Sequence, residues 1–187
     1  MKKLLYIVIA IVVLGLLCWA FSGKSNAAQG RALIAYFSAT GNTAGVAQNL
    51  ASATGAELFE IQPMAAYTAE DLDWRNDKSR ASVEMADRRS RPEVASRIEN
   101  IDQYDVIFLG FPIWWGREPS IIDTFLESYD FAGKTIIPFA TSGSTPTTTQ
   151  AAENMRLVAP NANILDGARF PVDVSADELK TWANEQF

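Results

Sequence analysis

Six residues, SATGNT at positions 38–43, have the composition of a loop that can bind a phosphate group. Four of the six carry a hydroxyl or an amide, and none carries a charge. A strand-like apolar run precedes them and an alanine-rich helical segment follows, so the free N–H groups of a helix start would add donors. Gly41 would let the backbone fold round a small anion. The plainer alternative is a loop whose Ser or Thr side chains cap the helix. The lysine of a P-loop and the GxGxxG turn are both absent.

A second stretch, GFPIWWGREP at positions 110–119, follows a continuous apolar run and contains two adjacent tryptophans. In a loop, one indole could stack on a planar ligand while the other packs against the protein. Alternatively, both are core or interface residues. The place of the pair after a buried strand, with Gly116 beside it, favours the ligand.

A third stretch, TSGSTPTTT at positions 141–149, is again small, hydroxylated and uncharged. Its backbone N–H groups could donate hydrogen bonds to the carbonyl oxygens of a ring. Alternatively, its side chains could simply cap the next helix. Taken together, the three stretches fit one ligand that has a single phosphate and a flat ring with polar edges. FMN matches that description better than NAD, ATP or GTP, which need more phosphate contacts, and ATP and GTP usually need a Mg²⁺ site as well.

Composition excludes several other kinds of chemistry. The 187-residue chain has no histidine, so Ser-His-Asp and Cys-His nucleophiles and imidazole metal ligands are excluded. Its one cysteine, Cys18, lies in an apolar run, so disulfides within the chain and thiolate metal sites are excluded as well. The net charge is −6 and no basic stripe is visible, which argues against nucleic-acid binding. We therefore expect no metal site and assign no catalytic residue. Any chemistry should come from a bound cofactor or from a carboxylate.

Alternating strand and helix patterns indicate how the three stretches are positioned. Strands are predicted over 31–37, 56–61, 104–111, 134–140 and 163–170, and helices over 43–54, 119–131, 147–160 and 175–187. This alternation predicts an α/β, doubly wound, five-stranded parallel sheet of flavodoxin-like order 2-1-3-4-5. Residues 63–100 form a polar excursion with a helix around 79–89. Because ligands bind beyond the carboxyl ends of such strands, the three stretches should meet at one edge.

Three motifs, YFSATGNT (36–43), GFPIWWG (110–116) and TSGS (141–144), resemble those of the flavodoxin family, and in particular flavodoxin-like proteins with a PIWWG loop around the isoalloxazine ring. The resemblance covers residues 31–187 and departs mildly at Ala35, where the family prefers a larger apolar residue. It implies phosphate contacts from Ser38, Thr40, Gly41, Asn42 and Thr43. It implies ring contacts from Pro112, Ile113, Trp114, Trp115, Gly116, Ser142, Gly143 and Ser144.

The resemblance also implies a function, the shuttling of electrons through bound FMN between redox partner proteins or to a small-molecule acceptor. Two alternatives stay open: an FMN-dependent reductase of the NAD(P)H:quinone type, and a non-redox, membrane-tethered module of the same fold. The excursion is unlike short-chain flavodoxins, so partner specificity is open. Its acids Asp71, Asp73, Glu84 and Asp87 could dock a basic redox partner or form a solvated face.

The N-terminal segment forms a separate unit. Lys2 and Lys3 precede an apolar run at 4–21, and small polar residues follow it, which is the layout of a secretory signal peptide. The run is also nearly long enough for a membrane anchor, so residues 1–27 are predicted to be one or the other, ahead of a domain at 28–187. All 22 acids but only 13 of the 16 basic residues lie beyond residue 27, so the domain carries a charge of −9. The leading lysines favour export of that domain to the periplasm or outside the cell, with or without a tether to the cytoplasmic membrane.

Overall fold

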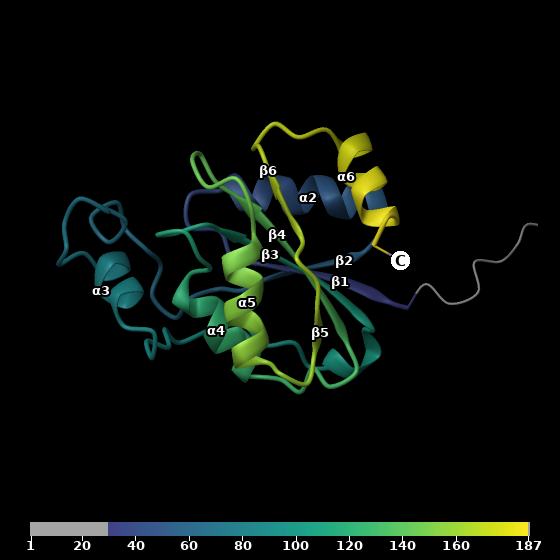
Figure 1. Ribbon diagram of the computed structural model, residues 1–187, viewed down its shortest axis with the longest axis horizontal. Coiled ribbons are helices and arrows are strands. Elements are labelled where there is room, and N and C mark those ends of the chain that lie inside the picture. Colours follow the sequence, from purple (N-terminus) through teal and green to yellow (C-terminus); the bar gives the residue numbers. More distant parts are fainter. Residues whose placement is uncertain (1–29, 187) are drawn as a thin grey trace, which may run out of the picture.

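The computed structural model describes residues 30–186, which form one parallel sheet with helices on both faces (Figure 1). The predicted N-terminal signal or anchor lies outside these residues. Within them, no helix has both the length and the apolar character needed to cross a bilayer. The strands are β1 (Ala32–Tyr36), β2 (Glu57–Glu60), β3 (Val106–Pro112), β4 (Thr135–Thr141), β5 (Asn163–Ile164) and β6 (Ala168–Phe170).

Strand order is β2-β1-β3-β4-β5, with β6 also paired to β4, and every pair is parallel. The predicted order 2-1-3-4-5 is therefore confirmed. The helices are α2 (Asn42–Thr54), α3 (Arg80–Ala86), α4 (Ser120–Glu127), α5 (Thr149–Val158) and α6 (Ala176–Asn184), and a short 3₁₀ turn, η1, spans Ile101–Gln103.

Two apolar clusters hold the layers together. One lies between the sheet and α2 and α6, and the other lies between the opposite face of the sheet and α4 and α5 (Figure 1). The central strand β3 is buried on both faces, which explains its unbroken apolar sequence. Gly110 in β3 lies against the ring of Phe139, where an added Cβ would approach Cζ to 2.2 Å. Only glycine fits at this point of the core.

The fifth strand position differs from the prediction of one continuous strand over 163–170. It is divided into β5 and β6 by residues 165–167. Pro138 of β4 has no N–H to donate to its neighbour, and Gly167, with φ of 71°, packs against the Pro138 carbonyl oxygen. The missing donor interrupts the ladder at the place where the chain bulges.

Helix boundaries follow the predictions with small shifts at the ends. Ser175 caps α6 by accepting a hydrogen bond from the Glu178 N–H at 3.2 Å. The helix α4 ends at Glu127 rather than at residue 131. The aromatic residues beyond it leave the helix, and Tyr129 and Phe131 pack their rings against Phe125 instead.

The excursion at 63–100 lies beyond the carboxyl ends of β1 and β3, on the left of Figure 1. An antiparallel bridge between Pro63 and Val94 closes its two ends. Its helix α3 is capped by Ser79, which accepts from the Ser82 N–H at 3.3 Å. The expected helix is therefore present, although it stops at Ala86.

Candidate functional site

Backbone pairing at the carboxyl ends of β1, β3 and β4 brings the three predicted loops together. Phe37 N–H donates to the Gly110 carbonyl at 2.9 Å, which ties the end of β1 to β3. Ile113 N–H donates to the Thr141 carbonyl at 2.9 Å, and Pro112 lies opposite Thr141 in the register of β3 and β4. The loop 38–43, the segment after Pro112 and the loop 142–148 thus share one edge.

Within the described part of the chain, the loop 38–43 leaves hydrogen-bonding groups without partners. Gly41 has a left-handed φ of 87° and occupies the N-cap position of α2, and no side chain caps this helix. The Ser38 hydroxyl oxygen is buried and has no hydrogen-bond partner among the described residues. Buried polar atoms are nearly always paired, so an orphan beside an uncapped helix start indicates a place for an anion. The alternative of ordinary Ser or Thr capping is not what the structure shows.

Thr43 has a different environment from its neighbours in the loop. Thr40, Gly41 and Asn42 are exposed, whereas Thr43 is buried and its hydroxyl lies 2.9 Å from the hydroxyl of Thr141. This hydrogen bond connects α2 directly to the end of β4. The Thr43 side chain therefore joins two of the loops, and either hydroxyl can be the donor of this hydrogen bond.

The residues Trp114–Arg117, here called the indole turn, form a tight hairpin. Trp114 N–H donates to the Arg117 carbonyl at 2.9 Å, and Arg117 N–H donates back at 3.0 Å. The two central residues, Trp115 and Gly116, have φ of 47° and 81°. Two consecutive positive φ values are typical of a type I′ turn. The turn points the two indoles differently: Trp115 is 53% exposed, and Trp114 is packed against the domain.

Trp114 packs within a cluster of three aromatic rings. Its ring centroid lies 5.6 Å from that of Phe37 and 5.4 Å from that of Tyr67, both in edge-to-face geometry, and Phe37 and Tyr67 are 5.7 Å apart. Phe37 immediately precedes the loop 38–43, and Tyr67 belongs to the excursion. The cluster therefore joins both loops to the excursion.

Buried charges lie directly behind the indole turn. Glu118 and Asp123 are both completely buried, and Arg117 is 8% exposed. Arg88 pairs with Glu118 at 2.8 Å, while Arg88 and Arg91 approach Asp123 only to 3.6 and 3.7 Å. Neither oxygen of Asp123 has a hydrogen-bond partner among the described residues. Burial, together with the neighbouring Glu118 carboxylate, raises the pKa of Asp123 to about 7.

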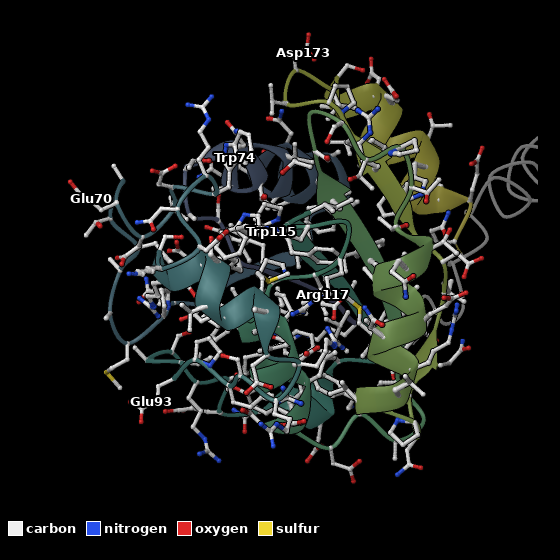
Figure 2. All side chains as sticks on the ribbon, turned by 60° about the vertical axis from the view of Figure 1, so that its left-hand side comes forward. Glu70, Trp74, Glu93, Trp115, Arg117 and Asp173 are labelled. Carbon is white, nitrogen blue, oxygen red and sulfur yellow. The ribbon has the colours of Figure 1, made fainter. Side chains whose placement is uncertain are left out.

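Arg117 connects this charged cluster to the excursion (Figure 2). Its guanidinium donates to the Glu118 carbonyl at 2.9 Å and to the Met85 carbonyl of α3 at 3.1 Å. Burial lowers the pKa of Arg117 from its usual value. Figure 2 shows Trp115 and Arg117 close to α3, on the side of the molecule that carries the excursion.

The loop 142–148 is organised by its own hydroxyls. The Ser142 hydroxyl accepts from the Ser144 N–H at 3.2 Å and from the Thr145 N–H at 2.9 Å, which leaves Gly143 and Ser144 exposed at the tip. Thr148 occupies the N-cap position of α5 without a side-chain cap, since its hydroxyl donates to the Asp166 carbonyl. The helix-capping alternative for this loop is therefore not what the structure shows.

Sequence reasoning missed several residues that support the site, namely Tyr67, Arg117, Glu118, Asp123 and Thr141. One signal was available: Asp123 interrupts an otherwise apolar helical face in SIIDTFLE. Of the four acids considered for docking, Glu84 is already engaged, because it accepts hydrogen bonds from Tyr67 and from Arg80.

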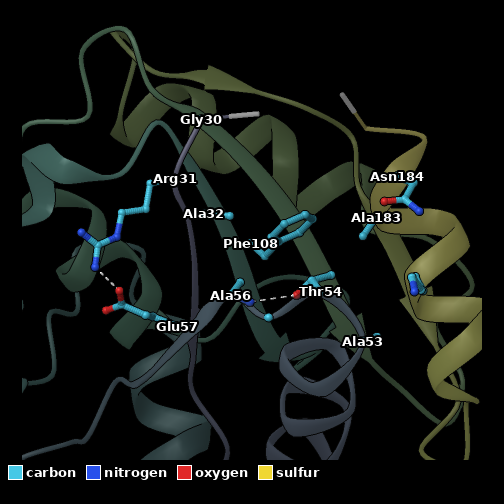
Figure 3. Close-up of a pocket in the computed structure, with 12 residues that line it drawn as sticks. Gly30, Arg31, Ala32, Ala53, Thr54, Ala56, Glu57, Phe108, Ala183 and Asn184 are labelled. Carbon is cyan, nitrogen blue, oxygen red and sulfur yellow. Dashed lines mark hydrogen bonds and ion pairs between the residues drawn. The ribbon is translucent and has the colours of Figure 1, made fainter. Parts of the chain in front are cut away.

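A cavity of about 470 Å³ lies at the opposite edge of the sheet (Figure 3). It is lined by the start of β1, the connection between α2 and β2, and the end of α6. Arg31 and Glu57 at its border form an ion pair with each other, as the dashed line in Figure 3 shows. None of the three predicted loops reaches it. Within residues 30–186 there is also no cluster of three or more acidic, histidine or cysteine side chains placed to hold a metal ion.

Comparison with known proteins agrees with this architecture. No curated protein matches the chain. The chain is 47% identical to a candidate flavoprotein from Bacteroides uniformis, covering 83% of this chain and 98% of that one, with a TM-score of 0.78. It is 42% identical to a candidate flavoprotein from Bacteroides eggerthii, covering 83% and 96%, again with a TM-score of 0.78. A flavoprotein from Lactobacillus acidophilus, solved in complex with FMN, shares the fold at 24% identity and a TM-score of 0.62, covering 82% and 99%.

The family model described as flavodoxin matches residues 31–186, which is almost the whole of the described chain. The parallel sheet, its strand order and the three loops at its carboxyl edge are consistent with that match. The chain belongs to the flavodoxin family.

Proposed function

We propose that the domain binds FMN at the carboxyl edge of the sheet and transfers electrons through it. The observation that carries this proposal is the buried Ser38 hydroxyl, which has no hydrogen-bond partner within residues 30–186 and lies beside the uncapped start of α2. The FMN seen in the Lactobacillus acidophilus flavoprotein supports the choice of ligand. Bound FMN supplies the redox chemistry, since it can take up and release one or two electrons.

The residues of the loop 38–43 would hold the phosphate without any charged side chain. The Ser38 hydroxyl is a buried donor, and the backbone N–H groups from Thr40 to Thr43 add further donors at the positive end of α2. The left-handed Gly41 lets these N–H groups converge.

The indole turn and the loop 142–148 would hold the ring. Trp115 offers a half-exposed indole face for stacking, and Pro112 and Ile113 place the turn at the end of β3. Gly143 and Ser144 are exposed at the loop tip, where the Gly143 N–H and the Ser144 hydroxyl would face polar ring edges. The acidic domain disfavours added negative charge in the site, which lowers the reduction potential. Because the chain has no histidine, protons reach the site from water or from a carboxylic acid.

An absorption titration tests this function directly. Purified domain mixed with FMN should show a shifted flavin spectrum with saturable binding, and dithionite followed by air should bleach and restore it. A domain that stays colourless after FMN addition and gel filtration would contradict the proposal and favour the non-redox module.

One observation favours a second candidate, the FMN-dependent reductase. A cavity of about 320 Å³ lies beside Trp115, lined by Asp77, Ser82, Met85, Ala86 and Arg117. A cavity next to Trp115, which is proposed to stack on the flavin ring, has room for a small electron acceptor. Steady oxidation of NADH or NADPH by the FMN-loaded domain, accelerated by a soluble quinone, would rank the reductase above the carrier.

The N-terminal sequence supports a further proposal about location. We propose that residues 1–27 direct the domain out of the cytoplasm, because Lys2 and Lys3 precede the apolar run at 4–21. The electron partners are then exported or membrane-bound proteins, or small acceptors in that compartment. Fractionation of cells that express the full chain, with mass determination of the mature N-terminus, tests both export and cleavage.

A further inference from the structure

The excursion at 63–100 carries a tyrosine that contacts the wall of the site without belonging to any of the three loops. The Tyr67 ring meets Trp114 of the indole turn and Phe37 at the base of the loop 38–43, at centroid distances of 5.4 and 5.7 Å. Tyr67 is not among the residues predicted to contact the flavin.

Tyr67 is itself held from behind by the helix of the excursion. The guanidinium carbon of Arg80 lies 4.0 Å from the centroid of the Tyr67 ring, which is a close cation–π contact. The Tyr67 hydroxyl donates to Glu84, and Arg80 pairs with Glu84 at 2.7 Å. Arg80 also donates to the Ala65 carbonyl at 2.7 Å, which fixes the segment that leads to Tyr67. The Arg80 cation and the Glu84 carboxylate thus restrain the Tyr67 side chain together.

The other side of the indole turn is attached to the same helix. Arg117 donates to the carbonyl of Met85 at the end of α3, so α3 contacts the turn through Tyr67 on one side and through Arg117 on the other. A turn with two consecutive positive φ values has an intrinsic conformational cost. Contacts from both sides can hold it in that conformation before any ligand binds.

We propose that Tyr67 is a positioning residue for the flavin ring: held by Arg80 and Glu84, it fixes Trp114 and thereby sets the orientation of the indole turn. The inference rests on the proposed FMN site and adds to it a function for the excursion, which preorganises the ring wall. Preorganisation raises affinity because the cost of ordering the wall is met during folding instead of during binding.

The test compares Tyr67→Leu with Tyr129→Leu. Tyr129 is a matched control just beyond the end of α4 and away from the three loops. It is also half-buried, packs its ring against Phe125 and Phe131, and accepts a hydrogen bond from the Ile98 N–H at 2.7 Å. Loss of two aromatic contacts at Tyr67 should weaken FMN binding about tenfold, measured by quenching of flavin fluorescence. The control should leave the FMN dissociation constant unchanged while lowering the melting temperature by a similar amount.

Three further measurements separate positioning from a general loss of structure. Tyr67→Phe keeps the ring and loses only the bond to Glu84, so it should restore most of the affinity. Inorganic phosphate, used as a competitor of FMN, reports the loop 38–43 alone, and its inhibition constant should be the same in wild type and Tyr67→Leu. The near-ultraviolet circular dichroism of the indoles in the FMN-free protein should change in Tyr67→Leu and stay as in wild type in Tyr67→Phe.

The outcomes distinguish the inference from the function on which it rests. If wild type binds no FMN, the proposed function fails. If wild type binds FMN and Tyr67→Leu binds it equally well, only the positioning role fails. An equal loss in Tyr129→Leu, or an equal loss of phosphate affinity, would also overturn that role, because either result describes a general destabilisation.

Discussion

The loop 38–43 and the indole turn lie at the same edge of the sheet, but different parts of the molecule hold them in place. The loop 38–43 is fixed by the elements that flank it: β1 ends in it, α2 starts from it, and a single hydrogen bond joins Thr43 to Thr141. The indole turn depends on residues from far along the chain, since Tyr67, Met85, Arg88 and Arg91 all belong to the excursion.

The two regions also differ in their charged side chains. The loop 38–43 contains no charged side chain, and its donors are a hydroxyl and backbone N–H groups. Behind the indole turn lie two completely buried carboxylates and three arginines. A phosphate needs only ordered donors at a helix start, whereas a two-residue turn with strained φ values needs a support that can be built only by tertiary contacts.

The largest expected effect comes from placing a charge in the loop 38–43. Ser38→Asp should weaken FMN binding more than about a hundredfold, because juxtaposed like charges cost several kcal/mol in a desolvated site. The FMN-free protein should keep its stability, since a carboxylate near an uncapped helix start interacts favourably with the helix dipole. Isothermal titration with FMN and urea unfolding measure the two quantities.

A matched variant controls for the added charge. Ser52 is exposed near the other end of α2, so Ser52→Asp adds the same charge away from the loop and should leave FMN affinity as in wild type. Retention of FMN binding within about tenfold in Ser38→Asp would mean that the phosphate lies elsewhere.

The two tryptophans should separate stability from binding. Trp114→Leu removes two edge-to-face contacts in a packed cluster and should lower the free energy of unfolding by about 2–3 kcal/mol. Trp115→Leu changes a half-exposed side chain and should alter it by less than about 0.5 kcal/mol, yet weaken FMN binding about tenfold. Urea unfolding of the FMN-free variants and flavin fluorescence titrations provide the values. A large stability loss in Trp115→Leu would contradict the assignment of the exposed indole to the ligand.

The difference between the two regions also explains what the sequence could predict. Strand and helix periodicity predicted the sheet order. The rule that ligands bind beyond the carboxyl ends of parallel strands predicted that the three loops lie at one edge of the sheet. Ser38 and Gly41 could be proposed for the site because the role proposed for them depends on neighbours in the chain. Local patterns are sufficient wherever the flanking elements do the positioning.

The supports of the indole turn could not be predicted in the same way. Tyr67 and Trp114 are far apart in the sequence, and nothing in the polar composition of residues 63–100 indicates which aromatic residue turns inward. The break between β5 and β6 was missed for a related reason, because it depends on Pro138 of the neighbouring strand. Contacts between distant segments require the tertiary structure.

Asp123 provides a pH-dependent test of the charged support. Its pKa is about 7 in the folded protein, against an ordinary value of 3.8, so the folded state holds a proton that the unfolded state has released between these two values. The contribution of Asp123 to stability therefore falls as pH rises from about 4 to about 7. Asp123→Asn should be more stable than wild type by about 1–2 kcal/mol at pH 8, because it removes a buried ionised group whose arginine partners lie beyond hydrogen-bond distance.

The pH dependence of this difference is the decisive readout. Urea unfolding at pH 5 and pH 8 should show that the advantage of Asp123→Asn shrinks as the pH falls, since wild-type Asp123 becomes neutral there. Asp166→Asn is a suitable control, because Asp166 pairs with Arg156 at 2.6 Å on the surface. An advantage of Asp123→Asn that is equally large at pH 5 would show that ionisation of Asp123 is not its cause.

The smallest expected effect concerns the turn itself. Gly116 has φ of 81°, and an added Cβ would meet no atom within 4 Å, so Gly116→Ala tests backbone strain without steric overlap. The variant should lose about 1 kcal/mol of stability, the cost of a left-handed conformation for alanine. Gly143→Ala is the matched control, since Gly143 also faces open space at the same edge and has no positive φ. If both variants unfold at the same urea concentration, the excursion does not hold the turn in a strained form. If only Gly116→Ala is destabilised, the turn keeps its left-handed conformation in the variant, because α3 and the aromatic cluster hold it there.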